Sequence, residues 1–206
     1  MSALKTEQDT ILIDMPVPIV TPRLILRPTM PGDGAETVRA VTETWDDLHR
    51  WMDWATVMPT EAETEARARR VYAQFILRED FSFIGVEKES GRKVVWNGLH
   101  CFDWKSRRFY TGYWVRKSAQ GRGYAAEACN AIVRYAFAVL AARRIEITHS
   151  EGNEASRRII EKLGFGREGL RRGGTLLPSG SMADSHVYAR LSPDGLPPLD
   201  VRWGPP

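Results

Sequence analysis

Hydrophobic and polar positions follow two periods along the first half of the chain, one typical of strands and one typical of helices. Residues 23–27 (RLILR) predict a short strand, and residues 33–54 carry large apolar side chains at helical spacing, on a helix that could be broken in two. A capping-box pattern opens a further helix over Thr60–Leu77. Residues 81–102 predict a hairpin around a Gly-containing turn, and residues 109–115 predict another strand.

The second half shows the clearer pattern. Residues 123–140 repeat small and apolar side chains at helical spacing, and residues 144–148 (RIEIT) predict a strand. Residues 153–163 predict a second helix followed by a glycine, which suits a helix C-terminus. The last two strands are expected over residues 165–171 and 185–191. This loose alternation predicts a mixed α/β fold in which helices cover a sheet.

The 206 residues are enough for one domain, which we expect over residues 21–191. Residues 1–20 hold a short apolar run followed by prolines, which predicts an N-terminal extension. Residues 192–206 carry five prolines and no periodicity, which predicts a Pro-rich C-terminal tail. Both ends are expected to lie at the surface.

Charge and composition narrow the classes of protein. The formal net charge is +3, but basic and acidic residues are interspersed, so the balance permits an anionic small ligand and does not require a nucleic acid. No stretch has the pattern of a signal peptide or a membrane span. Cys101 and Cys129 lack metal-ligand spacing and are expected to pack as small hydrophobic side chains. We therefore expect a cytoplasmic protein with no metal and no membrane or nucleic-acid partner.

The segment Arg116–Ala125 (RKSAQGRGYA) joins a predicted strand to a predicted helix and carries the most specific signal. Gly121 and Gly123 let the backbone curl so that successive N–H groups point inward, and the start of the helix adds unpaired donors. Such a turn suits a pyrophosphate, to which its three basic side chains could add charge. Two other interpretations remain. The glycines could form a tight turn only, or GRGYAA could be a dinucleotide fingerprint, although that motif normally opens repeated βαβ units.

Three motifs in order resemble the GNAT N-acyltransferase superfamily. Gly112–Trp114 and Gln120–Ala125 resemble its Q/R-x-x-G-x-G/A acyl-CoA loop and the strand before it. Asn153–Ser156 and Glu161–Phe165 look like its N-x-x-S and EKLGF elements. The resemblance extends over residues 21–191 and is strongest to the Rim-type branch, which acetylates the N-terminal amines of ribosomal proteins.

The resemblance implies a central mixed, mostly antiparallel sheet of about seven strands, splayed in the middle and flanked by helices. Acetyl-CoA would lie in the splay as the acyl donor, with no metal. Its pantetheine arm would pair with backbone groups of Trp114, Val115 and Arg116, and Asn153 would add a side-chain hydrogen bond; Asn153 could equally cap the helix that it opens. The pyrophosphate would be held by N–H groups of Gln120, Gly121, Arg122, Gly123, Tyr124 and Ala125. Relatives of the Rim type are often dimers, so a homodimer is implied as well.

Amide formation from a thioester needs a neutral amine, a polarised carbonyl and a stabilised thiolate. Many family members protonate the thiolate with a Tyr on the second helix, which this chain lacks, so Ser156 is the acid candidate and can also contact acetyl-CoA. Family members often carry a Glu just before the Gly-Tyr-Trp stretch, where this chain has Tyr110. His100, Asp103 and Glu146 are possible substitutes for that base. The catalytic candidates are thus Ser156, Tyr110 and His100.

The resemblance places the acceptor site beside Trp45, Trp51, Met52 and Trp54, although aromatic residues at helical spacing also suit a core. An α-amine has a pKa about 2.4 units below that of a Lys amine, so a chain without the usual Glu favours an α-amine acceptor. We expect an acetyl-CoA-dependent N-acetyltransferase that acts on a protein or peptide N-terminus. The alternatives are a small-molecule amine acceptor, a non-catalytic acyl-CoA-binding module, and a basic nucleic-acid-binding protein with aromatic platforms.

Overall fold

A single sheet of nine strands organises the computed structural model, which describes residues 10–205. The strands follow the order β7-β8-β6-β5-β4-β3-β2-β1-β9, and only the pair β5–β6 is parallel. The sheet is therefore mixed and mostly antiparallel, as expected. Its strands are β1 (Ile19–Val20), β2 (Leu24–Pro28), β3 (Phe81–Glu87), β4 (Lys93–Asp103), β5 (Arg108–Val115), β6 (Arg144–Ser150), β7 (Gly166–Leu176), β8 (Met182–Arg190) and β9 (Arg202–Trp203).

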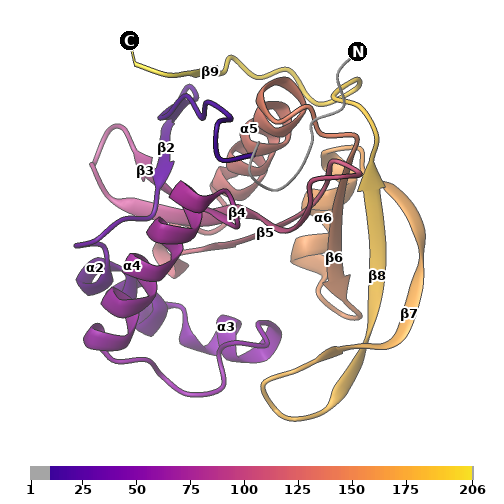
Figure 1. Cartoon of the computed structure of the whole chain (residues 1–206). Coiled ribbons are helices and arrows are strands. Elements are labelled where there is room, and N and C mark those ends of the chain that lie inside the picture. The colour runs from indigo at the N-terminus through magenta and orange to yellow at the C-terminus, as the bar shows by residue number, and fades with distance from the viewer. Residues whose placement is uncertain (1–9, 206) are drawn as a thin grey trace.

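Helices cover the sheet and connect its strands (Figure 1). The predicted break in the first helical stretch is confirmed, because Thr44 separates two helices. The capping box of Thr60 and Glu63 is also present and opens the third helix. The helices are α2 (Gly34–Glu43), α3 (Trp45–Trp51), α4 (Glu61–Leu77), α5 (Tyr124–Val139) and α6 (Glu154–Lys162), with a short 3₁₀ turn η1 (Lys117–Ala119) before α5.

The parallel pair β5–β6 holds together only at one end. The last paired residues are Tyr110 and Glu146, whereas β5 continues to Val115 and β6 to Ser150. Figure 1 shows β6, β7 and β8 standing apart to the right of the other strands. The splay predicted in the middle of the sheet is therefore present, and it exposes backbone edges of both strands.

The α5 helix forms the centre of the core. Its inner residues, among them Ile132 and Tyr135, are fully buried against Phe83, Phe109 and neighbouring side chains of the sheet. The ring of Tyr135 meets Phe83 edge to face at 6.3 Å, a favoured geometry for aromatic pairs. Burial of one large apolar side chain contributes about 1.5–3 kcal/mol, so this layer fixes the strand-to-helix turn that precedes α5.

Segments near both ends of the chain form strands and pack on the core, which the sequence did not predict. β1 lies in the predicted N-terminal extension and β9 in the predicted tail, and the two strands pair with each other, which raises the strand number from the expected seven to nine. The tail crosses the top of Figure 1, and Leu196 is buried in the core with 7% exposure. Short apolar contacts at Leu196 and Trp203 hold it there, and such isolated contacts have no periodicity to detect. Residues 1–9 of the predicted extension lie outside the described residues.

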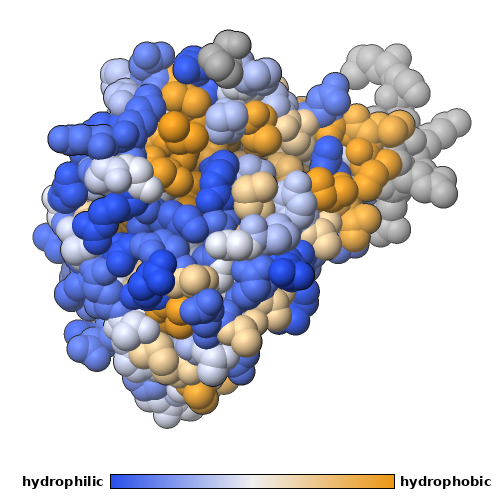
Figure 2. All heavy atoms as spheres, turned by 90° about the vertical axis from the view of Figure 1, so that its left-hand side faces the viewer, coloured by the Kyte–Doolittle hydropathy of each residue, from blue (hydrophilic) through white to orange (hydrophobic). Residues whose placement is uncertain are grey.

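The outer surface on the side of α2 and α4 is mostly hydrophilic, with hydrophobic side chains gathered in patches (Figure 2). Of the seven tryptophans, all of them in the described residues, only Trp54 is exposed, at 42%. No helix within residues 10–205 has the length and apolar character needed to cross a membrane.

Candidate active site

The loop before α5 has the backbone shape expected of an anion-binding turn. Gly121 and Gly123 both adopt positive φ, at 73° and 84°, which side chains rarely tolerate. A Cβ added to Gly121 would meet no atom within 4 Å, so the space beside this glycine is open. Gly123 precedes the first turn of α5, where backbone N–H groups lack helical partners. The residues present therefore fit a pyrophosphate.

The basic side chains of this loop are paired with acids. Arg116 is bonded to Glu36 and, at 2.5 Å, to Glu43, while Lys117 lies 2.8 Å from Asp47. Burial would raise the pKa of Glu43, but hydrogen bonds from Ser118 and Arg116 outweigh it and lower that pKa to about 2. These contacts tie the loop to α2 and α3, so the side chains of Arg116 and Lys117 hold the loop in place.

The remaining residues of the loop make equally definite contacts. The Gln120 amide donates to Asp47 at 3.0 Å and to the Val115 carbonyl at 3.3 Å. Arg122 donates to Glu87 at 2.9 Å, and the buried hydroxyl of Tyr124 donates to the same carboxylate. Ala125 is buried behind them. The side chains thus fix the turn from outside. The Gln120 N–H donates to the Lys117 carbonyl at 3.2 Å, which corrects the expectation for Gln120 and leaves the N–H groups from Gly121 onward as the ligand-facing part.

The free edge of β5 can be assigned from its pairing with β4. The Arg116 N–H donates to the Val94 carbonyl at 3.0 Å, so Arg116 faces β4. Because backbone groups of successive residues in an antiparallel strand point to opposite sides, those of Val115 and Tyr113 face the splay. A pantetheine arm lying there would meet Val115 and Tyr113, while Trp114 and Arg116 direct their backbone groups to β4.

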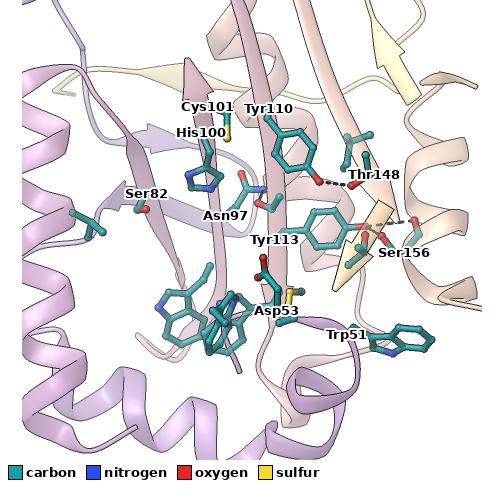
Figure 3. A pocket seen from close by; sticks show the side chains of 18 of the residues that line it. Trp51, Asp53, Ser82, Asn97, His100, Cys101, Tyr110, Tyr113, Thr148 and Ser156 are labelled. Carbon is teal, nitrogen blue, oxygen red and sulfur yellow. Dashed lines mark hydrogen bonds between the residues drawn. The ribbon is translucent and has the colours of Figure 1, made fainter. Parts of the chain in front are cut away.

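A cavity of about 1120 Å³ begins at the splay and extends under the α3–α4 connection. Side chains from β4, β5, β6, β7 and the start of α6 line it (Figure 3). It is large enough to hold an acyl group together with an acceptor. Loop residues 116–125 do not line it, so the pyrophosphate-type turn and the reaction chamber are separate parts of one site.

Ser156 lies at the wall of this cavity, where α6 faces the splay. Asn153 caps the helix, because its Oδ1 accepts from the Ser156 N–H at 3.1 Å, which confirms the capping interpretation. The Ser156 hydroxyl is hydrogen-bonded to the Tyr113 hydroxyl at 3.2 Å (Figure 3). Burial raises the pKa of Tyr113, so this phenol stays protonated and the pair keeps exchangeable protons beside the splay.

Tyr110 also points into the cavity, from the paired end of the splay. Its hydroxyl lies 2.5 Å from Thr148 Oγ1 on β6 (Figure 3). Burial raises the pKa of Tyr110 above its ordinary value of 10.0. A phenol with a raised pKa is a poor proton acceptor at neutral pH, so Tyr110 suits a hydrogen-bonding role better than that of a base.

His100 occupies the cavity wall on β4, directly opposite Tyr110 in the strand register. Its Nδ1 lies 2.6 Å from Asp80 Oδ2, and the two side chains are 32% and 21% exposed. The imidazole therefore has one nitrogen held by a carboxylate and remains partly open to the cavity.

The two other base candidates have different surroundings. Glu146 lines the cavity but is held by Arg144 at 2.8 Å, with Arg108 and Arg171 within 4 Å. Asp103 accepts the Ser106 N–H in the β4–β5 turn and does not line the cavity. Of the three substitutes, His100 alone combines a place at the cavity with a nitrogen free for a proton.

The aromatic candidates divide between the cavity and the core. Trp51, Met52 and Trp54 line the cavity, and Trp54 lies 6.4 Å from Trp114, which stacks on Trp96 at 4.1 Å. Trp45 does not line it: its ring stacks on His49 at 5.3 Å and packs against Val41, Leu48 and Ala55. The expectation for Trp45 is corrected because the first turn of α3 faces this small core.

The two cysteines also differ. Cys129 is buried as expected, and burial raises the pKa of its thiol to about 12. Cys101 is exposed at the cavity instead, because an irregularity after His100 gives it a positive φ of 50°. Within residues 10–205, no group of three or more His, Cys, Asp or Glu side chains is arranged to hold a metal ion.

Comparison with known proteins identifies the family. Residues 23–166 match the family described as "Acetyltransferase (GNAT) domain". The chain therefore belongs to the GNAT acetyltransferase family, whose acyl donor is acetyl-CoA, and it is an N-acetyltransferase of that family.

The chain is also similar to individual acetyltransferases. The chain is 29% identical to YdaF of Bacillus subtilis (strain 168), named as a candidate ribosomal N-acetyltransferase, over 84% of this chain and 93% of the relative. Its fold matches RimL, the ribosomal L7/L12 α-N-protein acetyltransferase in complex with coenzyme A, with a TM-score of 0.78, 20% identity and coverage of 84% and 96%. It also matches the microcin C7 self-immunity acetyltransferase MccE in complex with acetyl-CoA and AMP, with a TM-score of 0.77, 16% identity and coverage of 83% and 93%.

Sequence reasoning missed three side chains of the cavity region. Asp80 could have been found by extending the predicted hairpin, because the register Phe81↔Leu99 places the next pair at Asp80 and His100. Tyr113 and Thr148 could not, since their partners lie across the splay, on elements far apart in the chain.

Proposed function

We propose that this N-acetyltransferase moves the acetyl group of acetyl-CoA directly to the α-amine of a protein or peptide N-terminus. The observation that supports this most is one cavity that joins a splayed strand edge, a Ser156–Tyr113 hydroxyl pair and the His100 imidazole. Donor, proton donor and proton acceptor can then meet without a covalent acyl-enzyme.

The donor would bind along the splay. Backbone N–H groups of residues 121–125 would hold the pyrophosphate, and Val115 and Tyr113 would pair with the pantetheine arm. Asn153 would contribute mainly as a helix cap, because its Oδ1 is bonded to the Ser156 N–H. This arrangement would bring the thioester toward the cavity wall at Ser156.

The proton inventory follows from these positions. Acetyl-CoA supplies the reactive carbonyl; His100 would accept a proton from the attacking amine, and the Ser156 hydroxyl would donate one to the departing sulfur. Tyr113 would orient Ser156, and Tyr110 would keep the wall closed through Thr148. A single imidazole suits an α-amine with a pKa of about 8, since roughly a tenth of it is already neutral at pH 7.

The experiment is acetyl-CoA-dependent thiol release with peptides that begin with Ser, Ala or Met, each compared with its N-terminally blocked form. Release that requires the free N-terminus supports the proposal. Release that persists with a blocked N-terminus and an internal Lys would contradict the α-amine assignment.

A small-molecule amine is the second candidate, and the aromatic wall favours it. Trp51, Trp54 and the stacked Trp96–Trp114 pair would suit a planar or apolar amine as well as a peptide. Turnover of arylalkylamines with no turnover of any free peptide would decide for this candidate. The homodimer and the cytoplasmic location expected from the sequence stay predictions.

A further inference from the structure

We propose that Asp80 is a positioning residue that gives His100 the tautomer it needs to accept a proton, so that Asp80 and His100 act as one unit. The inference rests on the proposed function, in which His100 takes the proton of the acceptor amine.

The carboxylate of Asp80 is fixed on both oxygens. Oδ2 meets His100 Nδ1 at 2.6 Å, and Oδ1 accepts from the Ser82 hydroxyl at 3.0 Å. An ionised carboxylate only accepts hydrogen bonds, so Nδ1 carries the proton of the neutral ring. Nε2 is then left with its lone pair. A hydrogen bond to one ring nitrogen setting the state of the other is a general property of histidine.

The position of the ring is set by the missing side chain of Gly98. A Cβ there would lie 2.7 Å from His100 Nε2 and 2.6 Å from Cε1, so the imidazole lies over this glycine. Asp80 itself stands in the connection between α4 and β3, one step beyond the paired residues Phe81 and Leu99. The imidazole is thereby held from two sides, and His100 is one of the residues that line the cavity.

Other charged and titratable groups border the same cavity without replacing Asp80. They are Asp53 in the α3–α4 connection, Glu63, Arg67 and Arg70 on α4, Arg108, Tyr110 and Tyr113 on β5, Glu146 and His149 on β6, Arg171 on β7, and Cys101 on β4 itself. In the described part of the chain, Asp80 is the one ionisable side chain hydrogen-bonded to His100. The state of His100 Nε2 therefore depends on this carboxylate.

The reaction balances with these groups. The amine nitrogen forms a bond to the acetyl carbon, and the carbon–sulfur bond breaks. One proton passes from nitrogen to His100 Nε2, and one passes from the Ser156 hydroxyl to the departing sulfur. Solvent then removes the extra proton from His100 and supplies one to the Ser156 oxygen, so the products are the acetylated amine and coenzyme A. Asp80 keeps its charge throughout and stabilises the imidazolium.

The test combines Asp80→Asn with ¹⁵N NMR of the His100 ring and steady-state kinetics on the full chain. We expect the wild type to carry the proton on Nδ1. In Asp80→Asn the amide can donate to Nδ1, so the proton should move to Nε2. The kcat should then fall by about 10²- to 10⁴-fold with KM for acetyl-CoA unchanged. A wild-type ring with its proton on Nε2, or a kcat of Asp80→Asn within threefold of wild type, overturns the inference.

A double variant and a matched control complete the design. In a His100→Gln background, Asp80→Asn should not lower kcat any further. Fully additive losses of kcat in the double variant would contradict a single unit. The control is Glu151→Gln, which removes the carboxylate paired with His186 outside the cavity and should leave kcat unchanged. If the wild type acetylates no amine, the proposed function fails, while the wild-type NMR spectrum still decides whether Asp80 sets the tautomer.

Discussion

The two sides of the splay are built differently. The proposed donor side is one continuous turn, residues 116–123, whose first part is held by acids of α2 and α3 while the backbone N–H groups from Gly121 onward are left for the ligand. The acceptor side gathers side chains from the α3–α4 connection and from β4, β5, β6 and β7 around one cavity. A backbone cradle depends on conformation at two glycines, whereas a side-chain cavity changes with each residue in its wall. We therefore expect proteins of this fold to share the donor, and we expect the acceptor to be specific to this chain.

The largest effect is expected where the two sides meet, at Ser156. Ser156→Ala removes the hydroxyl proposed to protonate the thiolate, so kcat should fall by at least about 10²-fold with little change in KM for acetyl-CoA. Stopped-flow or steady-state thiol release measures this. Ser106→Ala in the β4–β5 turn is the control, and an unchanged kcat in Ser156→Ala would remove Ser156 from the mechanism.

Replacement of Asp33, in the scaffold behind the acceptor side, should lower the free energy of unfolding by an amount that depends on pH. Burial would raise its pKa, but hydrogen bonds from Arg27 and Lys93 outweigh burial and lower it from 3.8 to about 2. A lowered folded-state pKa stabilises the fold above about pH 4, and this contribution disappears as the pH falls toward 2. Asp33→Asn should thus lose about 2 kcal/mol of unfolding free energy at pH 7 and far less near pH 2.

Urea unfolding at pH 7 and near pH 2 measures the Asp33 effect. Asp46→Asn, an exposed carboxylate on α3, should change the unfolding free energy by less than about 0.5 kcal/mol. Equal destabilisation of Asp33→Asn at both pH values would mean that packing, and not the charge, makes the contribution.

The donor turn should respond to backbone strain alone. Gly123→Ala forces a side chain into a positive φ of 84° and costs about 1–2 kcal/mol, so KM for acetyl-CoA should rise about tenfold. Gly91→Ala, at a φ of 69° in the β3–β4 turn, carries a similar strain away from the site and should leave that KM unchanged. Equal KM values in both variants would show that the turn does not hold the donor.

The smallest effect belongs to the acceptor wall. Trp54→Ala removes an exposed ring close to Trp114 and should raise KM for the acceptor about fivefold, close to 1 kcal/mol. The same variant serves as its own control, because KM for acetyl-CoA should stay constant. A change confined to acetyl-CoA would place Trp54 on the donor side.

The same division separates the features that the sequence could predict from those that it could not. The turn before α5 lies within ten consecutive residues, so glycine spacing and a helix start were sufficient to predict its backbone shape, while its role in holding the donor stays a prediction. Strands and helices such as β6 and α5 were also predicted within one or two residues, because each has its own period. The contacts of Tyr113 with Ser156 and of Tyr110 with Thr148 join segments that only the folded sheet brings together. Tertiary packing likewise determines where the Trp45 ring lies, why Cys101 is exposed, and why the strands β1 and β9 form.

The link from Glu43 to the donor turn has a consequence for evolving new acceptors. Glu43 accepts the Ser118 N–H at 2.7 Å and pairs with Arg116, while the next helix leads directly to Trp51 and Trp54. Mutations that remodel α2 and α3 would shift the turn as well. Selection for a new acceptor would therefore weaken the binding of the coenzyme. Libraries confined to β7 and the α3–α4 connection after Trp54 would leave that linkage intact and explore acceptor range separately.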